Sequence, residues 1–486
     1  MPVPARHRRT LLTVLLCAAP FMTVLDANVV AIALPSLRDD LQFSRSGVQW
    51  VIGAYSLAFG STLLLAGRAA DLYGRRRLLV LGLGLFSAAA LAGAVAPTRE
   101  ALLCARAAQG IGAAMAFPAS LALIAQLFAR GEQRNRALGV YGALISAAFV
   151  WGMIAGGLLT ASLGWRATLL ITVPIGGAAA LATMRLVPVA RPAAALPRPG
   201  LPGVLAAGAG ALTLLYGLGL AARPGERTAG VAVIVSAIVL LGAAVRVERR
   251  SPSPLVPPGL LRRPDMASAV VAALLTVATG VGAVFVLTLH LQDVLGYGPL
   301  AAGLALTPLG VAGALAGLLV PRIARRTGLS RALTGALAVQ GAGVALLACV
   351  GVNRGLGVVM AGVAAFGFGH FAATVAFTAL ATAAASQAEH GVVTGVISSA
   401  QQIGGAMGLA VLAAVATARA AASGEGSESA QAVVEGFRWA LATGAGLSLL
   451  AAALVLALSG RPRPSPGRRP ASGWRTTPSR GRSSPP

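Results

Sequence analysis

The stretch GRAADLYGRRR, residues 67–77, separates two long apolar runs and decides how the rest of the chain is interpreted. Its glycines, Gly67 and Gly74, permit a tight turn, and three arginines follow the second of them. The flanking runs each approach the roughly 20 residues that an α-helix needs to cross a bilayer. The stretch therefore predicts a short basic loop that joins two membrane-spanning helices.

The composition of the chain is typical of a membrane protein. Of its 486 residues, 56% are hydrophobic and 11% are charged, and the mean hydropathy is +0.79. Soluble domains carry about a quarter of charged residues. We therefore predict an all-α polytopic membrane protein with fourteen transmembrane helices. Their predicted centres lie near residues 22, 56, 88, 115, 148, 176, 210, 238, 278, 309, 340, 370, 402 and 448.

The formal net charge of +25 comes from arginines, since none of the 39 basic residues is a lysine. The arginines form short clusters between apolar runs instead of one stripe, and this distribution argues against binding to nucleic acid. Clusters of this kind orient membrane helices, with the arginine-rich loops in the cytoplasm. Both termini belong to that set, so we expect a multi-pass protein of the plasma membrane with both ends cytoplasmic.

Neither a metal site, a cofactor site nor an enzymatic site is expected. The three cysteines, Cys17, Cys104 and Cys349, lie far apart in apolar runs and far from any histidine at metal-ligand spacing. The paired glycines lack the preceding strand of a phosphate-binding loop, and no nucleophile constellation is present.

The chain repeats itself in parallel. Three pairs of stretches match: LRDDLQF at 37–43 with LQDVLGY at 291–297, AAQGIG at 107–112 with AAFGFG at 364–369, and ISAAFVWGMIAG at 145–156 with ISSAQQIGGAMG at 397–408. Helices one to six thus resemble helices nine to fourteen. Parallel six-helix halves around a midplane site are a transporter architecture.

We predict four segments from this pattern. Residues 1–190 form an N-terminal six-helix bundle, and 191–262 form two inserted helices with flanking cytoplasmic loops. Residues 263–460 form a C-terminal six-helix bundle. The tail, 461–486, consists mainly of Pro, Arg, Ser and Gly, and we expect it to be a disordered basic cytoplasmic segment.

The basic loop resembles the loop signature of the major facilitator superfamily in its spacing of Gly67, Asp71, Gly74, Arg75 and Arg76. The basic residue that usually follows the aspartate is absent here. The resemblance implies the major facilitator fold and a conformational-gating loop, in which the aspartate accepts hydrogen bonds from helix N-termini and from arginines of both halves. A merely basic loop is the alternative.

The stretch LDANVVAIALP, residues 25–35, is similar to a first-helix motif of the fourteen-helix drug:proton antiporter branch of that superfamily. The second-helix pattern of the branch fits Gln49, Trp50 and Tyr55. The resemblance covers nearly the whole chain except its tail.

Asp26 is the one acidic residue that we place near the middle of the membrane. A carboxyl group there is costly, which makes it a candidate for function, and such a buried group could carry a proton at neutral pH. A structural role, in which Asp26 locks the first helix by hydrogen bonds, is the alternative.

The stretch RAAQGIGAA, residues 106–114, resembles the intramembrane arginine motif of the superfamily, with Arg106, Gln109, Gly110 and Gly112. The first three share one helical face. A cation next to a proton-carrying acid would act as a switch, because protonation of Asp26 would release the arginine. A static ion pair is the alternative, and the sequence does not show whether the two side chains touch.

The fifth helix carries an incomplete form of the exporter motif of the family. Gly152, Gly156 and Gly157 match, Ala148 replaces the first glycine, and Met153 replaces the proline. The repeat has small residues in the same register and also lacks the proline: Ala400, Gly404 and Gly408. We predict that both stretches are close helix-packing faces, and that the missing proline leaves the direction of transport open.

Other polar residues are candidates for substrate binding: Asn28, Gln49, Trp50, Tyr55, His370, Gln401 and Gln402. His370 could alternatively relay protons, or it could be a packing residue.

The resemblance implies a proton-coupled secondary transporter that exports small amphipathic organic compounds by alternating access. Its expected partners are the substrate, protons and the lipid bilayer, and we expect it to act as a monomer. One alternative is a proton-coupled importer on the same fold, which should show more convergent polar groups. The other is a non-transporting membrane sensor or scaffold, which should carry an added soluble domain.

Overall fold

Each predicted membrane span is a helix, or a pair of consecutive helices, in the computed structural model of the chain. All the elements that it contains are helical, in the residues that it describes: 5–44, 47–128, 132–188, 201–221, 226–250, 259–349, 356–385, 389–422 and 430–459. The observed helices lie at the predicted centres. The predicted tail, 461–486, lies outside the described residues.

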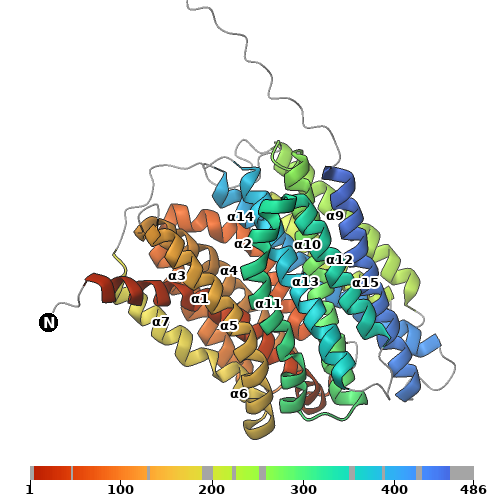
Figure 1. Cartoon of the computed structure of the whole chain (residues 1–486). Coiled ribbons are helices and arrows are strands. Elements are labelled where there is room, and N and C mark those ends of the chain that lie inside the picture. Colours follow the sequence, from red (N-terminus) through yellow and green to blue (C-terminus); the bar gives the residue numbers. More distant parts are fainter. Residues whose placement is uncertain are drawn as a thin grey trace, which may run out of the picture.

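The first group of helices, called the N-terminal half below, forms one side of the molecule in Figure 1. Its α6 and α7 follow each other directly and together occupy the predicted sixth span. The members are α1 (Ala5–Asp40), α2 (Trp50–Tyr73), α3 (Arg75–Ala94), α4 (Arg99–Leu127), α5 (Glu132–Leu163), α6 (Arg166–Leu170) and α7 (Thr172–Leu186).

The second group, called the C-terminal half, forms the other side. The π-helical turn η1 extends α10 directly. The members are α10 (Pro264–Leu289), η1 (His290–Val294), α11 (Pro299–Thr327), α12 (Leu329–Ala348), α13 (Leu356–Ala383), α14 (His390–Ala422) and α15 (Ala430–Ser459). The two inserted helices are α8 (Leu201–Ala221) and α9 (Arg227–Arg250).

The helices are long and apolar enough for a bilayer. Among the described residues, eleven helices meet the length and composition of a membrane span, and α2 and α5 contain shorter apolar stretches. Their outward faces are apolar as well as exposed, with Leu81, Leu181, Leu318 and Leu456 each more than half exposed. Exposed apolar side chains on so many helices fit lipid and not water. The prediction of a polytopic all-α membrane fold is therefore confirmed.

Two seams join the halves, and they are related by the sequence repeat. In one seam α5 packs against α11, where a side chain on Gly157 would collide with the backbone of Leu300 at 2.7 Å. In the other, α2 packs against α14, where a side chain on Gly60 would lie 2.9 Å from the Cβ of Gln402. Since α2 corresponds to α11 and α5 to α14, each seam joins a second helix of one half to a fifth helix of the other.

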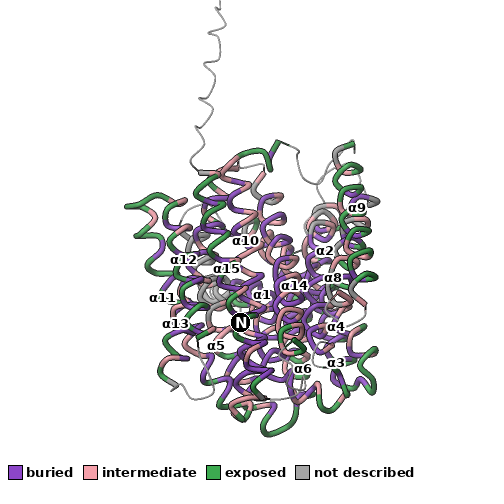
Figure 2. Tube along the Cα trace, turned by 90° about the vertical axis from the view of Figure 1, so that its right-hand side faces the viewer, coloured by how far each residue is buried: buried purple, intermediate pink, exposed green. Residues whose placement is uncertain are grey.

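The inserted helices α8 and α9 form a hairpin that covers one of these seams. The α8 helix contacts both α2 and α14, and its Gly208 lies against Ser61 of α2. Figure 2 shows α8 and α9 beside α2, on the side of the molecule opposite α11–α13. Much of α9 is exposed along its length, including Val231, Ile238 and Val239.

The halves also meet at the end of the molecule where α1 ends, which we call the arginine-poor end. Arg38 of α1 forms a bidentate ion pair with Asp293 of η1, at 2.5 and 3.2 Å, and both side chains are largely buried. The amide nitrogen of Gln292 donates to the carbonyl oxygen of Ile32 at 2.9 Å. Arg38 and Gln292 occupy the same place in the repeat, so each half extends one polar side chain to the other.

Candidate functional site

A buried polar network surrounds Asp26 in the N-terminal half. Arg106 Nη1 donates to one carboxylate oxygen of Asp26 at 2.6 Å, and Gln109 Nε2 donates to the other at 2.7 Å. The same Arg106 nitrogen donates to Gln109 Oε1 at 2.7 Å, and Arg106 Nε donates to the carbonyl oxygen of Val51 at 3.0 Å. The three predicted residues therefore form one connected group.

The network is closed to solvent in this conformation. Asp26 is 0% exposed, and Arg106 and Gln109 are each 1% exposed. The ring of Tyr55 covers the guanidinium group, with its centroid 4.6 Å from Arg106 Cζ. A buried ion pair of this kind is held by complementary charge and hydrogen bonds, and removing either partner leaves an uncompensated charge. A proton can therefore reach or leave Asp26 only when the surrounding helices move.

Glycines of α5 determine how closely that helix approaches Asp26. A side chain on Gly152 would lie 2.7 Å from Asn28 Cβ, and one on Gly156 would lie 2.8 Å from the Cα atom of Val29. Both contacts fall on the turn of α1 that carries Asp26. The small residues of the fifth helix thus pack against the acidic helix itself.

Glycines of α4 place Arg106 in a similar way. A side chain on Gly110 would meet Ala58 Cβ and the Phe59 backbone nitrogen of α2, each at 3.1 Å. One on Gly112 would meet the Phe86 backbone of α3 at 2.6 Å. Because α4 approaches α2 so closely, the arginine can reach the Val51 carbonyl.

The second copy of the small-residue face makes the matching contact in the C-terminal half. Gly404 lies against the backbone of Leu274, and Gly408 lies against the backbone of Ala278, both on α10. Ala400, like Ala148 in the first copy, is buried. Both fifth helices therefore pack on the first helix of their own half.

Met153, which replaces the proline of the family motif, is fully buried in the α5–α11 seam. Its carbonyl group faces Gly303 of α11 so closely that a side chain on that glycine would collide with it. The seam thus forms around an ordinary helical backbone at this position.

The basic loop links helix ends within the N-terminal half. Gly74 adopts φ +99° between α2 and α3, a conformation that favours glycine, while Gly67 is in α2 with open space around it. Arg75 Nη1 donates to the carbonyl oxygen of Ala122 at 3.2 Å, and Arg76 donates to the carbonyl oxygens of Thr183 and Met184. These carbonyls lie near the C-terminal ends of α4 and α7, where a positive charge is favourable.

Asp71 belongs to α2, but its side chain lies outside the described part of the structure. The predicted contacts of this aspartate therefore stay predictions.

The other predicted residues of the N-terminal half do not form one binding surface. Asn28 is buried and donates to the carbonyl oxygen of Val24 at 2.7 Å. Gln49 and Trp50 line a narrow space between α2 and α14, together with Gly53, Ala406, Leu409 and Ala410. Tyr55 belongs to the Asp26 network.

In the C-terminal half, Gln401 and Gln402 are half-buried on α14, and Gln402 faces α2. His370 is half-buried on α13, between the rings of Phe366 and Phe371. Phe371 in turn contacts the ring of Phe149 from α5, with centroids 5.5 Å apart. His370 is thus close to the interface between the halves, away from Gln49 and Trp50.

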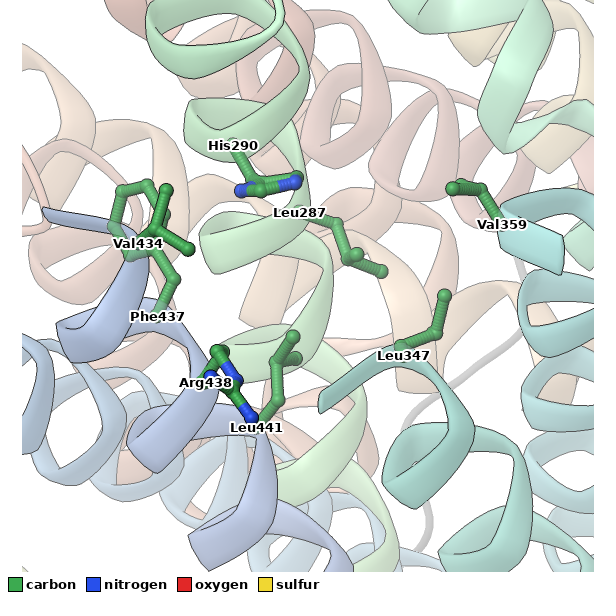
Figure 3. Close-up of a pocket in the computed structure, with 8 residues that line it drawn as sticks. All are labelled: Leu287, His290, Leu347, Val359, Val434, Phe437, Arg438 and Leu441. Carbon is green, nitrogen blue, oxygen red and sulfur yellow. The ribbon is translucent and has the colours of Figure 1, made fainter. Parts of the chain in front are cut away.

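A separate apolar pocket lies at the arginine-poor end of the C-terminal half (Figure 3). His290 projects into it from η1 and is 6% exposed, and its ring packs edge-on against Phe437. Neither ring nitrogen of His290 has a partner among the described residues. Arg438 also lines the pocket, while its Nε donates to the Ala348 carbonyl. None of these residues contacts the Asp26 network.

The sequence motifs did not predict the polar contacts between the halves. They also did not predict a group of buried polar residues in the C-terminal half that includes Thr276 and Gln340. Arg38 and Asp293 lie inside the repeated stretches, so the repeat marked them, but it did not show that they face each other. Thr276 and Gln340 of the C-terminal half belong to no motif. An alignment of the two halves, position by position, would have drawn attention to both as polar residues opposite apolar ones.

Comparison with known proteins agrees with this architecture. The model of the Major Facilitator Superfamily matches residues 16–409. The puromycin resistance protein pur8 of Streptomyces alboniger is 37% identical over 92% of this chain and 90% of that protein. The cephamycin export protein CmcT of Amycolatopsis lactamdurans is 35% identical over 83% and 84%. The POT family transporter PepTSo has the same fold, with a TM-score of 0.70 at 15% identity over 94% of this chain and 98% of that one.

Proposed function

The chain belongs to the major facilitator superfamily of transporters, and we propose that it exports small amphipathic antibiotic-like compounds in exchange for protons. Two relatives that align along most of the chain are named for puromycin resistance and for cephamycin export. The observation that carries the coupling mechanism is the closed network of Asp26, Arg106 and Gln109. It joins an acid and a base in a membrane-spanning bundle, where an unpaired charge is costly.

The orientation follows from the arginine distribution. We place the arginine-rich loops, and with them both termini, in the cytoplasm of a bacterial cell. The arginine-poor end, closed by Arg38 and Asp293, then faces outward. A structure joined at that end is closed to the outside in an alternating-access cycle. Opening to the outside requires this ion pair to separate.

Proton binding changes the balance of the network. The charged carboxylate of Asp26 accepts from both Arg106 and Gln109. A proton on that carboxyl group cancels its charge, so that Arg106 keeps the Gln109 and Val51 oxygens and the Tyr55 ring as partners. The weakened attachment between α1 and α4 allows the helices to move. We propose that Asp26 takes its proton from outside and releases it inside.

The gradient is sufficient to drive such a cycle. Each proton that enters supplies about 1.4 kcal/mol per unit of pH difference. The membrane potential adds about 2.3 kcal/mol per 100 mV for each charge moved. We propose that the exporter works as a monomer and that residues 191–262 are an accessory hairpin between the two six-helix bundles.

The substrate should be recognised mainly through apolar contacts. Apart from the Arg38–Asp293 pair at the arginine-poor end, the charged side chains that the described structure buries are Asp26 and Arg106, and the remaining candidates carry no fixed charge. Large apolar pockets with few fixed charges bind lipophilic compounds with little discrimination. We propose Asn28, Gln49, Trp50, His370, Gln401 and Gln402 as the polar groups that orient them.

Transport by reconstituted protein tests the proposal. In proteoliposomes with an imposed pH gradient, wild-type protein should move puromycin against its gradient, and Asp26→Asn should lose at least nine-tenths of that movement. The matched control is Glu100→Gln, because Glu100 is an exposed carboxylate at the start of α4, and it should transport normally. The double variant Asp26→Asn/Arg106→Gln covers the case in which the single variant fails to fold. Full coupled activity in a folded Asp26 variant would remove Asp26 from the mechanism.

Cells distinguish the direction of transport. Expression of the chain in a sensitive bacterium should lower the intracellular level of labelled puromycin. A raised level would indicate an importer, and an unchanged level for puromycin and a wider panel of toxic compounds would indicate a sensor or scaffold.

A further inference from the structure

The repeat aligns Asp26 with a glycine of the other half. The matching stretches that begin at Leu37 and Leu291 are 254 residues apart. The same offset places Gly280 of α10 at the position of Asp26 in α1. It places Thr276, one turn earlier, at the position of Met22. The C-terminal half therefore lacks the acid but has a polar residue next to its position.

Glycine contacts confirm the alignment of the third helices. Gly112 of α4 packs against the backbone of Phe86 in α3, and Gly369 of α13 packs against the backbone of Gln340 in α12. Since the two glycines match in the repeat, Gln340 occupies the place of Phe86. The buried aromatic ring of one half is thus an amide in the other.

The fourth helices, α4 and α13, differ at the residue that follows the matching glycine. His370, which follows the glycine of α13, aligns with Ala113, which follows the glycine of α4. Its ring fills the space above Gly280, where an added side chain would lie 2.7 Å from Nδ1. An imidazole therefore lies against the exact helix position that carries the acid in the N-terminal half.

Three polar residues of the C-terminal half meet at this point. Gln340 Nε2 donates to the carbonyl oxygen of Thr276 at 2.9 Å, and the imidazole of His370 lies against Gly280, one turn further along the same helix. Thr276 and Gln340 are fully buried, whereas His370 keeps part of its surface exposed. The three residues form one cluster, which we call the histidine cluster.

The histidine cluster holds buried polar atoms without hydrogen-bond partners. His370 Nδ1, Gln340 Oε1 and Thr276 Oγ1 have no hydrogen-bond partner among the described residues. The amide nitrogen of Gln340 is already used, so its free atom is an acceptor, and the lone pair of a neutral imidazole is an acceptor too. Buried polar atoms without partners are costly. A proton on the imidazole would turn its free ring nitrogen into a donor beside these acceptors.

Charged groups lie away from the histidine cluster. In the described parts of α10, α11, α12 and α13, which pack around it, the ionisable side chains other than His370 are near helix ends or in η1: Asp265, His290, Asp293, Arg322, Arg325, Arg326, Arg331 and Cys349. From α5, the described ring of Phe149 approaches through Phe371. The local environment of the imidazole therefore consists of neutral acceptors and aromatic rings.

We propose that His370 is a second proton-binding group, which takes a proton from water at its free ring nitrogen and holds it with Gln340 and Thr276. The step forms one N–H bond, and water loses that proton. The N-terminal half then binds one proton at Asp26, and the C-terminal half binds one at His370. Proton binding at His370 stands by itself, while its part in transport rests on the proposed export function.

Nitrogen-15 NMR of histidine-labelled protein in lipid tests proton binding directly. The chain has four histidines, so the signal that disappears in His370→Gln identifies the residue. We expect this signal to titrate between about pH 4 and pH 7. Gln340→Leu should move its midpoint to lower pH by about one unit, because the charged form loses an acceptor. His290→Gln, the control at the other buried histidine, should leave it unchanged.

Two outcomes of the titration would overturn the proposal. One is a wild-type His370 ring that stays neutral over the whole range. The other is a midpoint that Gln340→Leu does not move, which would separate the amide from the proton.

The number of protons per transport cycle tests the role in coupling. With the membrane potential clamped at zero, the logarithm of puromycin accumulation, corrected for protein-free liposomes, should rise with the pH difference with a slope of about two. His370→Gln should lower the slope to about one. A wild-type slope of one would exclude His370 from coupling and leave the export proposal intact. Absence of puromycin movement would count against the export proposal, while the titration would still decide proton binding.

Discussion

The two halves bury polar groups at complementary positions of the same repeat. In the N-terminal half both carboxylate oxygens of Asp26 are hydrogen-bonded, and the equivalent of Gln340 is the apolar Phe86. In the C-terminal half the equivalent of Asp26 is Gly280, and Gln340 has an unpaired oxygen. One half therefore buries a fully hydrogen-bonded ion pair, and the other buries neutral polar atoms that have no partners in the described structure. A common backbone arrangement thus supports two different kinds of polar chemistry.

The strongest test of the difference between the halves removes the positive charge of Arg106 from the Asp26 network. Arg106→Leu should destabilise the protein by about 3–5 kcal/mol, because Asp26 would remain buried and charged without its partner. The double variant Asp26→Leu/Arg106→Leu should be more stable than this single one, since no charge is left unpaired. Thermal unfolding followed by size-exclusion chromatography in detergent measures both. A double variant that is less stable than the single would show that the pair is not a compensated unit.

The close packing of each fifth helix on the first helix of its half should be equally sensitive to an added methyl group. Gly156→Ala in α5 and Gly408→Ala in α14 each force a methyl group against the backbone of the first helix of their half, and each should cost about 1–3 kcal/mol. Gly177→Ala in α7, where nothing lies within 4 Å, is the control and should not destabilise. The same unfolding measurement applies. If only one of the two glycines is sensitive, the halves do not share their packing as the repeat implies.

The smallest expected effect is the difference in stability loss between variants of the two buried glutamines, Gln109 and Gln340. Gln109 exchanges hydrogen bonds with two charged groups, whereas Gln340 makes one bond to a neutral carbonyl and leaves its oxygen unpaired. Gln109→Leu should therefore cost about 1 kcal/mol more than Gln340→Leu. Chemical or thermal unfolding of the two variants under one condition gives the difference. Equal losses would mean that the Gln340 oxygen has a partner in the membrane.

Sequence patterns predicted the fold well because bilayer thickness sets the length of each apolar run and arginines mark the loops. The helical spacing of Arg106 and Gln109 also predicted that they share a face. Their contact with Asp26 depends on how α1, α4 and α5 pack, which local spacing does not encode. Gly152 and Gly156 control that packing, and their motif indicated a close contact without identifying α1 as the partner.

The histidine cluster could not be predicted from motifs, because each of its residues is ordinary by itself. Thr276, Gln340 and His370 come from three helices, and only the folded chain brings them to the same turn of α10. The ion pair of Arg38 and Asp293 is similar in this respect, since its members are 255 residues apart.

The α8–α9 hairpin makes the two seams between the halves differ in their exposure to a compound dissolved in the lipid. One seam, α2 against α14, is covered by α8, while in the described structure no such hairpin covers α5 against α11. Exposed side chains near the uncovered seam include Trp151 of α5 and Leu315 of α11. A lipophilic molecule that diffuses in the plane of the membrane therefore meets one uncovered joint between the halves and one that is covered. The hairpin therefore makes the two seams of an otherwise twofold architecture differ in their access from the lipid.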